Sequence, residues 1–474
     1  MEALGGATAC SYSITTIAGV GGLSGSTGDG GNGVSALLSS SASGFTTDNT
    51  GQHGYIADYG NRKIRVLDLT MGTITTLATS LSADYAAGGT STSLPATMYP
   101  FAVDIGGTGK VLFVVDHTNH IVRKIVLSTG IMSRYVGSTT PGCTTDSTTL
   151  GNAFSLNYPR GIVVDSSNNV YIADTGNHRI VMTMNSTYMT SIVAGQTLGV
   201  VGGNSGSTGD GDPATSARLN APWGVALDVD GLLHIADTGN CRVRQVSSGI
   251  ITTVVGGFTG QVVCGYAGDG GPASSAVLNQ VVSIAFSPTN DMYLADISNY
   301  CIRIVNALTH IITTFAGSCV NQGATGDGPV AYARFNVING VTFDALGNLY
   351  VMDTGNDIVR KVNVRMATST GLSNTLAPTA AATALVTTGT TAAATAGTTF
   401  PSVVVITTMA GTGVQGGAGD GGRATSAQFN NPYDVKTDQK GNVYIAEYQG
   451  HKIRMVTVAG MRQPLSITST SLTN

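Results

Sequence analysis

The residues YIADTGNHRIVM at positions 171–182 decide the fold of this chain. A short apolar strand meets a turn that contains Gly and Asn, and a second strand rich in β-branched residues follows, which is the pattern of a β-hairpin. Related phrases occur at six other places. They are YIADYGNRKIRV at 55–66, FVVDHTNHIVRKI at 113–125, HIADTGNCRVRQV at 234–246, YLADISNYCIRIV at 293–305, YVMDTGNDIVRKV at 350–362 and YIAEYQGHKIRMV at 444–456.

The phrases return about every 57 to 63 residues, apart from one interval of about 94, and a steady period of this size is typical of a repeat architecture. A short strand that ends in Asp precedes the hairpin, as at 161–165 and 224–228. A strand of the type Ile-Thr-Thr follows it, as at 311–317 and 406–411. Each unit therefore has four strands, which we letter a to d in chain order.

The unit resembles the NHL repeat, whose pattern is P-x-G-V-A-x-D-x-x-G-N-x-Y-I-A-D-x-x-N-x-R-I-R. The resemblance covers residues 11–457 and implies a β-propeller, often a six-bladed one in that family. The seven phrases here predict seven blades instead. We therefore expect an all-β fold, a single seven-bladed β-propeller of four-stranded blades over 11–457.

The two ends of the chain predict how the ring closes. The strand at 14–18 has the sequence of a strand d, whereas the last unit, at 433–456, has strands a to c and no strand d after them. We expect the N-terminal strand to complete the last blade, which leaves no unpaired sheet edge between the first and last blades. The weakest match to the repeat is strand a of the first blade, at 44–48.

An acid ends strand b in every unit, and an Arg follows seven residues later in six of them. The hairpin makes acid and Arg cross-strand neighbours, so we predict one structural ion pair per blade. A ring of charges that lines a binding surface is the alternative, but a catalytic residue is needed once rather than in nearly every blade. The third unit has Asp174 but Val181 in place of Arg. The predicted pairs are Asp58–Arg65, Asp116–Arg123, Asp237–Arg244, Asp296–Arg303, Asp353–Arg360 and Glu447–Arg454.

A second recurring string is Gly-Asp-Gly, in the loop from strand d to the next strand a. We expect the Asp to accept backbone hydrogen bonds there, and calcium binding is the alternative. Some NHL-like propellers are amidating lyases with a His-bound metal in the channel, but His120, His178 and His451 occupy a turn position and the other histidines lack metal-ligand spacing. We therefore predict no catalytic residue, cofactor or metal. The strings lie at 28–31, 209–211, 268–271, 326–328 and 419–422.

Cysteines point to an oxidising compartment. Cys241 and Cys301 lie in b–c turns, and Cys264 and Cys319 lie in the d–a loops that follow them. These loops share one face of a propeller, so we predict the disulfides Cys241–Cys264 and Cys301–Cys319, with buried free thiols as the alternative. The pairing of Cys10 and Cys143 stays open. The sequon at Asn185 predicts glycosylation if a eukaryote secretes the chain.

Composition excludes several classes of function. Charged residues make up 11% of the chain, the net charge is −4 and there is one Trp, so nothing indicates a nucleic-acid partner. No run of 18 apolar residues indicates membrane insertion, and the first residues lack the pattern of a signal peptide. The segment 367–402, almost all Thr, Ala, Ser and Gly, is predicted to be a loop inserted in the sixth blade, either a tolerated insertion or a contact arm. The tail, 458–474, lies outside the repeat and has strand-like residues.

Together these features predict an extracellular or cell-surface structural or protein-interaction scaffold, not an enzyme. We expect protein partners or self-association, as in a surface layer, matrix or filament. A carbohydrate- or peptide-binding propeller, with glycans as possible ligands, is the alternative. A metal-dependent lyase is the third class. Fold alone does not decide among them.

Overall fold

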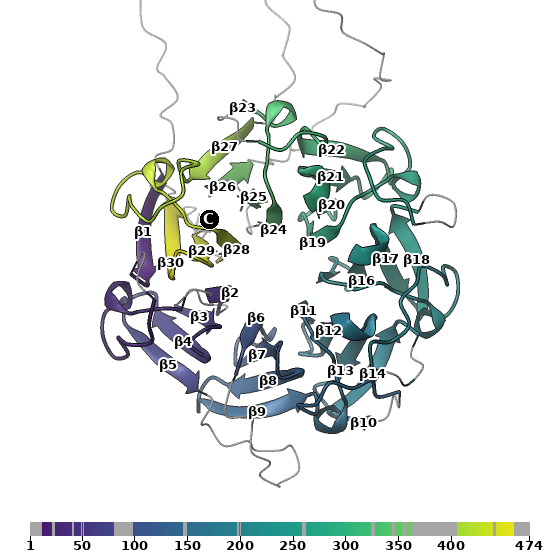
Figure 1. Ribbon diagram of the computed structural model, residues 1–474, viewed down its shortest axis with the longest axis horizontal. Coiled ribbons are helices and arrows are strands. Elements are labelled where there is room, and N and C mark those ends of the chain that lie inside the picture. The colour runs from purple at the N-terminus through teal and green to yellow at the C-terminus, as the bar shows by residue number, and fades with distance from the viewer. Residues whose placement is uncertain are drawn as a thin grey trace, which may run out of the picture.

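Small antiparallel sheets surround a central axis in the computed structural model of the chain (Figure 1). Each sheet has its first strand nearest the axis and its last strand at the rim. The all-β propeller that the repeat predicts is confirmed. The structure describes residues 12–20, 24–39, 42–48, 50, 52–79, 98–145, 149–196, 199, 201–257, 262–323, 328–343, 347–353, 358–362, 405–438 and 442–458.

Across the described residues the strands form seven sheets, which we call blades one to seven. From the axis outward, blade one has β2 (Ala42–Thr47), β3 (His53–Asp58), β4 (Lys63–Asp68) and β5 (Ile74–Thr79). Blade two has β6 (Pro100–Ile105), β7 (Val111–Asp116), β8 (Ile121–Val126) and β9 (Ile131–Val136). Blade three has β11 (Ile162–Val164), β12 (Val170–Asp174), β13 (Arg179–Thr183), β14 (Met189–Ala194) and the outermost β10 (Thr149–Leu150).

The other four blades repeat this order. Blade four has β15 (Val225–Leu227), β16 (Leu233–Asp237), β17 (Arg242–Ser247) and β18 (Ile250–Val255). Blade five has β19 (Val281–Phe286), β20 (Met292–Asp296), β21 (Cys301–Val305) and β22 (Ile312–Gly317). Blade six has β24 (Ile338–Phe343), β25 (Leu349–Asp353), β26 (Ile358–Val362), β27 (Val405–Ala410) and the outermost β23 (Gly328–Pro329). Blade seven has β28 (Pro432–Thr437), β29 (Val443–Glu447), β30 (Lys452–Val458) and β1 (Tyr12–Ala18).

Two blades depart from the predicted four strands. In blades three and six a two-residue strand from the d–a loop, β10 or β23, pairs with the outer strand β14 or β27. The d–a loop reaches the rim in other blades too, through single bridges such as Asn32 with Thr73 and Pro213 with Ile250. These contacts cover the outer edge of the sheet, which the four-strand pattern leaves exposed.

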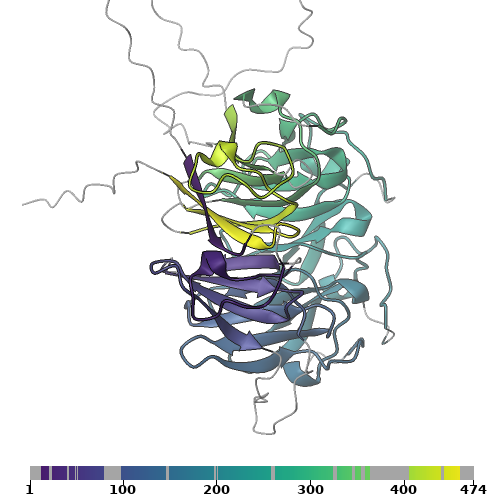
Figure 2. The same cartoon turned by 60° about the vertical axis from the view of Figure 1, so that its left-hand side comes forward.

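The first strand of the chain closes the ring, as predicted. Strand β1 pairs antiparallel with β30, and Ile14 is opposite Val456 while Thr15 is opposite Met455. Figure 2 shows the purple β1 lying along the yellow strands of the C-terminal blade. Blade one is also complete, because β2 pairs with β3 despite its weak match to the repeat.

Short 3-10 helices mark the loops. One group lies in the d–a loops and the other in the b–c turns, where a left-handed residue such as His178 (φ 55°) ends the turn. The d–a group is η1 (Gly33–Ser35), η2 (Gly151–Ala153), η4 (Ala214–Ser216), η6 (Ala273–Ser275), η8 (Val330–Tyr332) and η10 (Ala424–Ser426). The turn group is η3 (Thr175–Asn177), η5 (Thr238–Asn240) and η7 (Ile297–Asn299).

The hydrophobic core lies between neighbouring blades rather than at the axis. For example, Phe113 and Val115 of blade two pack with Ile172 and Val181 of blade three, and all four are fully buried. This packing leaves the innermost strands free to line a channel. Among the described residues no helix is long and apolar enough to cross a membrane. The predicted insertion 367–402 and most of the tail lie outside the described residues.

Candidate binding site

The strand-b acid joins three parts of each blade. In blade five, Asp296 accepts hydrogen bonds from the backbone N–H of Asn279 (2.7 Å), ahead of strand a, and from the side chain of Asn299 (2.8 Å), in the b–c turn. Its side chain is fully buried and lies 3.7 Å from Arg303. The corresponding backbone bond is present in the other blades, with acceptors Asp58, Asp116, Asp174, Asp237, Asp353 and Glu447.

The predicted ion pairs are present in five blades. Distances between acid and Arg are 3.6 Å for Asp58–Arg65 and 3.7 Å for Glu447–Arg454. The bonds are shorter for Asp116 with Arg123 Nε (2.8 Å) and for Asp353 with Arg360 Nε (3.0 Å). Acid and Arg are diagonal rather than directly opposite neighbours across the hairpin, because the Arg is displaced by two residues. Ile56, not Asp58, lies opposite Arg65.

Blade four corrects the predicted pair Asp237–Arg244. Asp237 is bound instead by Arg242, the residue directly opposite it, at 3.3 Å. Arg244 binds Asp210 of the Gly-Asp-Gly loop at 2.7 Å. Blade three behaves in the same way, since Arg179 binds Asp174 at 2.7 Å although Val181 occupies the usual Arg position.

The Asp of the Gly-Asp-Gly loop is a partner that we did not predict from the sequence. It binds the strand-c Arg at the rim side, as Asp269 binds Arg303 at 2.6 Å, and also a Thr of strand d. An Arg already occupies this carboxylate, and the described residues contain no group of three His, Cys, Asp or Glu that could hold a metal ion. In four of the five strings the Asp therefore joins the d–a loop to strand c, while Asp327 of the fifth lies outside the described residues. The calcium alternative is not tested. The other short pairs are Asp29–Arg65, Asp210–Arg244 and Asp420–Arg454.

Both predicted disulfides are present. Cys241, in the b–c turn of blade four, is bonded to Cys264, and Cys301, the first residue of β21, is bonded to Cys319, so each bond reaches a d–a loop. Cys143 is a free, half-buried thiol, while Cys10 lies outside the described residues. Asn185 lies in the turn between strands c and d, and its glycosylation stays a prediction.

Two of the three turn histidines have a structural role, whereas the buried Nδ1 of His451 has no hydrogen-bond partner among the described residues. Nδ1 of His120 accepts a hydrogen bond from the backbone N–H of Tyr158 (3.0 Å), and Nδ1 of His178 accepts one from Ala221 (2.8 Å). Each bond joins a turn to the entrance of strand a in the next blade. Burial lowers the pKa of both histidines, which favours the neutral, accepting form.

The innermost strands enclose a channel with a cavity of about 590 Å³. All strands a run in the same direction, so their first residues meet at one end, which we call the mouth. The b–c turns lie at the same end because strand b is antiparallel to strand a. The residues that ring the mouth are Phe101, Arg160, Trp223, Val282, Asn339 and Tyr433.

Aromatic side chains gather on one side of the mouth. Phe101 contacts Tyr433 edge-on, with 6.3 Å between ring centres, and also His117, at 5.2 Å. Tyr433 in turn contacts Tyr448, at 5.6 Å. The Arg160 guanidinium lies over the ring of Trp223, 3.9 Å from its centre. A connected aromatic surface therefore joins blades seven and two, and a cation–aromatic pair joins blades three and four.

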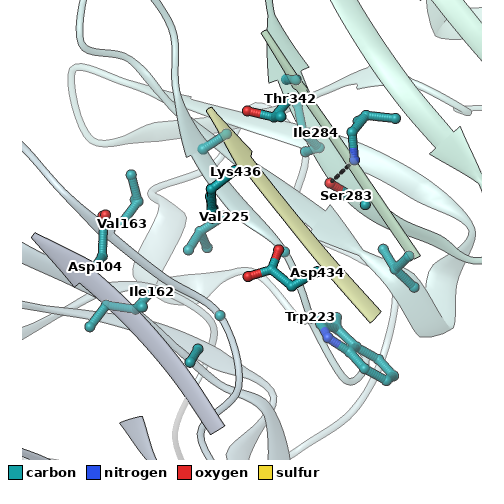
Figure 3. A pocket seen from close by; sticks show the side chains of 18 of the residues that line it. Asp104, Ile162, Val163, Trp223, Val225, Ser283, Ile284, Thr342, Asp434 and Lys436 are labelled. Carbon is teal, nitrogen blue, oxygen red and sulfur yellow. Dashed lines mark hydrogen bonds between the residues drawn. The ribbon is translucent and has the colours of Figure 1, made fainter. Parts of the chain in front are cut away.

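Four charged residues lie deeper in the channel. One of them, Asp228, follows β15 and accepts hydrogen bonds from the backbone N–H groups of Asp230 and Leu232 in its own turn. Asp434 and Lys436 are on β28, and Asp104 is on β6 (Figure 3). Asp434 Oδ2 accepts from the backbone N–H of Phe45 (3.3 Å), and Asp104 Oδ2 accepts from that of Val164 (3.1 Å), so each carboxylate joins its strand to the next blade. Burial raises the pKa of both carboxyls, and Lys436 opposes this rise.

The residues of this site do not appear among our sequence predictions. The sequence does contain one feature that points to this site. The third and fourth units have Gly161 and Gly224 directly after the variable mouth residue, whereas the seventh unit has Asp434 at the same position. A Cβ at Gly161 would lie 2.2 Å from the backbone of blade four, so the position needs a very small residue there. Asp434 is therefore a departure from the repeat rather than part of it.

The fold and the repeat together define the class: a β-propeller whose blades carry one four-strand unit each. An NHL repeat model matches residues 156–181, and a teneurin NHL domain model matches 182–263. The chain is a propeller built from NHL-type repeats.

Its curated relatives are distant and longer. Protein SUPPRESSOR OF QUENCHING 1, chloroplastic, of Arabidopsis thaliana is 24% identical over 54% of this chain. NHL repeat-containing protein 2 of Homo sapiens is 25% identical over 54%, and Teneurin-3 of Mus musculus is 27% identical over 44%. The matches cover 24%, 38% and 8% of those proteins, respectively.

Among solved structures, a streptogramin B lyase matches 94% of this chain and 98% of its own, with a TM-score of 0.52 and 11% identity. Virginiamycin B lyase from Staphylococcus aureus, in a structure with quinupristin, matches 88% of this chain and 94% of its own, with a TM-score of 0.51 and 14% identity. At such identities the likeness shows the fold alone.

Proposed function

We propose that this chain is a protein-interaction scaffold that recognises its partner at the mouth of the channel. The observation that carries the proposal is the connected surface of Phe101, Tyr433 and Tyr448 beside the Arg160–Trp223 pair. Trp, Tyr and Arg are the residue types that contribute most to the energy of protein interfaces. Phe101, Tyr433 and Trp223 are half-buried, so part of each remains accessible to a partner.

The compartment proposed is extracellular or the cell surface. Two disulfides support it, because such bonds persist in oxidising compartments and are rare in the cytosol. A second copy of the chain is one candidate partner, as in a surface layer, matrix or filament.

The mouth is tested by replacing its aromatic residues. The double variant Trp223→Ala/Tyr433→Ala is compared with the intact chain and with Tyr332→Ala, a variant of a 76% exposed Tyr in the d–a loop of blade six. Light scattering measures self-association, and affinity capture from the secreted fraction of the source measures other partners. We expect the intact chain and Tyr332→Ala either to self-associate or to capture a partner in stoichiometric amount. In the double variant we expect the affinity of that association to fall at least tenfold. Equal binding by all three proteins would contradict the proposal.

Carbohydrate binding is the second candidate function. The half-buried rings of Trp223 and Tyr433 at the mouth offer apolar surface beside the cavity. A glycan array probed with the same three proteins separates this candidate. Binding of one sugar class by the chain and by Tyr332→Ala, but not by the double variant, would favour it over protein recognition.

The third class, a metal-dependent lyase, has no support beyond the shared fold. The described residues contain no cluster suited to a metal. The expectation that the chain is not an enzyme stays a prediction.

A further inference from the structure

The channel charges sit where the repeat has none. In the equivalent positions of strand a, Asp434 corresponds to Gly161 and Gly224, and Lys436 corresponds to Val163 and Ala226. Residues two apart on a strand point to the same side, so Asp434 and Lys436 both face the channel, with their Cα atoms about 7 Å apart. Figure 3 shows both on one strand, with Asp104 on another strand that lines the cavity.

Lys436 is the member of this group without a bonded partner. Both carboxylates are held by backbone N–H groups, but no carboxylate of the described residues lies within 4.0 Å of the Lys436 ammonium. Lys436 acts on Asp104 and Asp434 only through the longer-range electrostatic attraction that opposes the rise in their pKa. An ammonium group that lines a cavity without a partner can accept an anionic group of a ligand.

Charges of both signs line the cavity. The acidic residues are Asp104, Asp228 and Asp434, and the basic residues are Lys436 and, at the mouth, Arg160. The Asp228 carboxylate is held within its own turn by the backbone N–H groups of Asp230 and Leu232. A simple cation would be repelled by Lys436, and a simple anion would be repelled by Asp104 and Asp434. A ligand with both charges can pair each with its opposite.

The cavity also has the size and walls of a small-molecule site. Its volume of about 590 Å³ falls within the range of roughly 300–1,000 Å³ that is usual for ligand pockets. Apolar residues such as Val163, Val225 and Ile284 line it between the charges.

We propose that the channel binds a small zwitterion of the amino-acid type, whose carboxylate pairs with Lys436 and whose ammonium pairs with Asp434, while its apolar body contacts the channel wall. The inference deepens the proposed function and rests on its choice of site, because it names the chemistry recognised inside the channel. A free amino acid and the terminal residue of a short peptide share this chemistry.

Titration calorimetry on the intact chain tests the proposal with matched ligands. The ligands are leucine, isoamylamine, which lacks the carboxylate, isocaproate, which lacks the ammonium, and leucyl-leucine. We expect saturable binding of leucine or of the dipeptide, and about tenfold weaker binding of each single-charge ligand. Tighter binding of the dipeptide than of leucine would identify a peptide as the source. Absence of saturable binding for both zwitterions, or equal affinity for a single-charge ligand, would overturn the proposal.

Three variants test which residue of the channel pairs with each charge of the ligand. Lys436→Met should weaken leucine and isocaproate about tenfold but not isoamylamine, and Asp434→Asn should weaken leucine and isoamylamine but not isocaproate. Lys110→Met, at an exposed position outside the channel, should change nothing. Circular dichroism and the thermal midpoint identify a variant that fails to fold, and Lys436→Ala then replaces Lys436→Met. Equal leucine affinity in Lys436→Met and Lys110→Met would overturn the proposal. The proposed function is tested separately, by whether the Trp223→Ala/Tyr433→Ala variant still binds the protein partner.

Discussion

A buried carboxylate holds each blade together at the level of single residues. Asp296 receives a backbone N–H from the entrance of strand a and an amide from the b–c turn, and it lies beside the Arg303 guanidinium. Arg303 in turn binds Asp269, which is 32% exposed at its side chain. The buried charge of Asp296 is therefore compensated by Arg303, which is in turn paired with the partly exposed Asp269.

Removing Arg303 from this set of ion pairs should destabilise the fold. Arg303→Met leaves Asp296 without its cationic neighbour, and loss of one partner of a buried pair costs about 3–5 kcal/mol. Chemical denaturation measures the change in the free energy of unfolding. The exposed variant Arg423→Met is the control and should change it by less than about 0.5 kcal/mol. A loss below about 1 kcal/mol for Arg303→Met would show that the pair does not stabilise the blade.

The acid of blade seven should make stability depend on pH. Burial raises the pKa of Glu447 to about 7, and its Oε1 atom has no hydrogen-bond partner. The folded state then binds a proton more tightly than the unfolded chain, so the contribution is complete below about pH 4.5 and is lost as pH rises through about 7. We expect a lower thermal midpoint at about pH 8 than at about pH 5. Glu447→Gln should flatten this slope, and an unchanged slope would rule Glu447 out as its source.

At the level of elements, hairpins are joined by contacts between loops. The disulfide Cys241–Cys264 ties the b–c turn of blade four to the d–a loop that follows, across 23 residues of sequence. Replacing both residues in Cys241→Ser/Cys264→Ser should lower the free energy of unfolding by about 2–4 kcal/mol. Denaturation of the oxidised protein measures this, with Cys143→Ser as a control for a free thiol. Equal loss in the two variants would mean that the disulfide does not constrain the loops.

The elements can be predicted from the sequence because a hairpin is a local structure. The phrase at 171–182 contains both strands and its own turn, and the turn positions of Cys241 and Cys301 place them near the next loop. Contacts across longer stretches follow less directly. The bond from Asp210 to Arg244 joins residues 34 apart, and the two-residue offset of the Arg depends on the length of the turn.

The channel could not be predicted, because its residues come together only when the ring closes. Trp223 and Tyr433 belong to blades four and seven, and no local pattern relates them. What could have been noticed is the change from Gly to Asp434 in a repeated position. At this scale, departures from a repeat are more informative about a binding site than the repeat itself.

At the level of the whole molecule, the channel exists only if β1 completes blade seven, because that closure places β28 and its charges beside the other innermost strands. The double variant Thr15→Cys/Met455→Cys tests this closure. The two residues lie opposite each other on β1 and β30, and paired strand residues are close enough for a disulfide. Cys10→Ser and Cys143→Ser remove competing thiols. The control pairs Thr15→Cys with Leu308→Cys in blade five, across the ring.

Mass spectrometry of the oxidised, digested protein then decides. We expect a disulfide between positions 15 and 455 in nearly every molecule, and free thiols in the control. Free thiols at 15 and 455, or efficient bonding of 15 to 308, would show that the ring is not closed in this way.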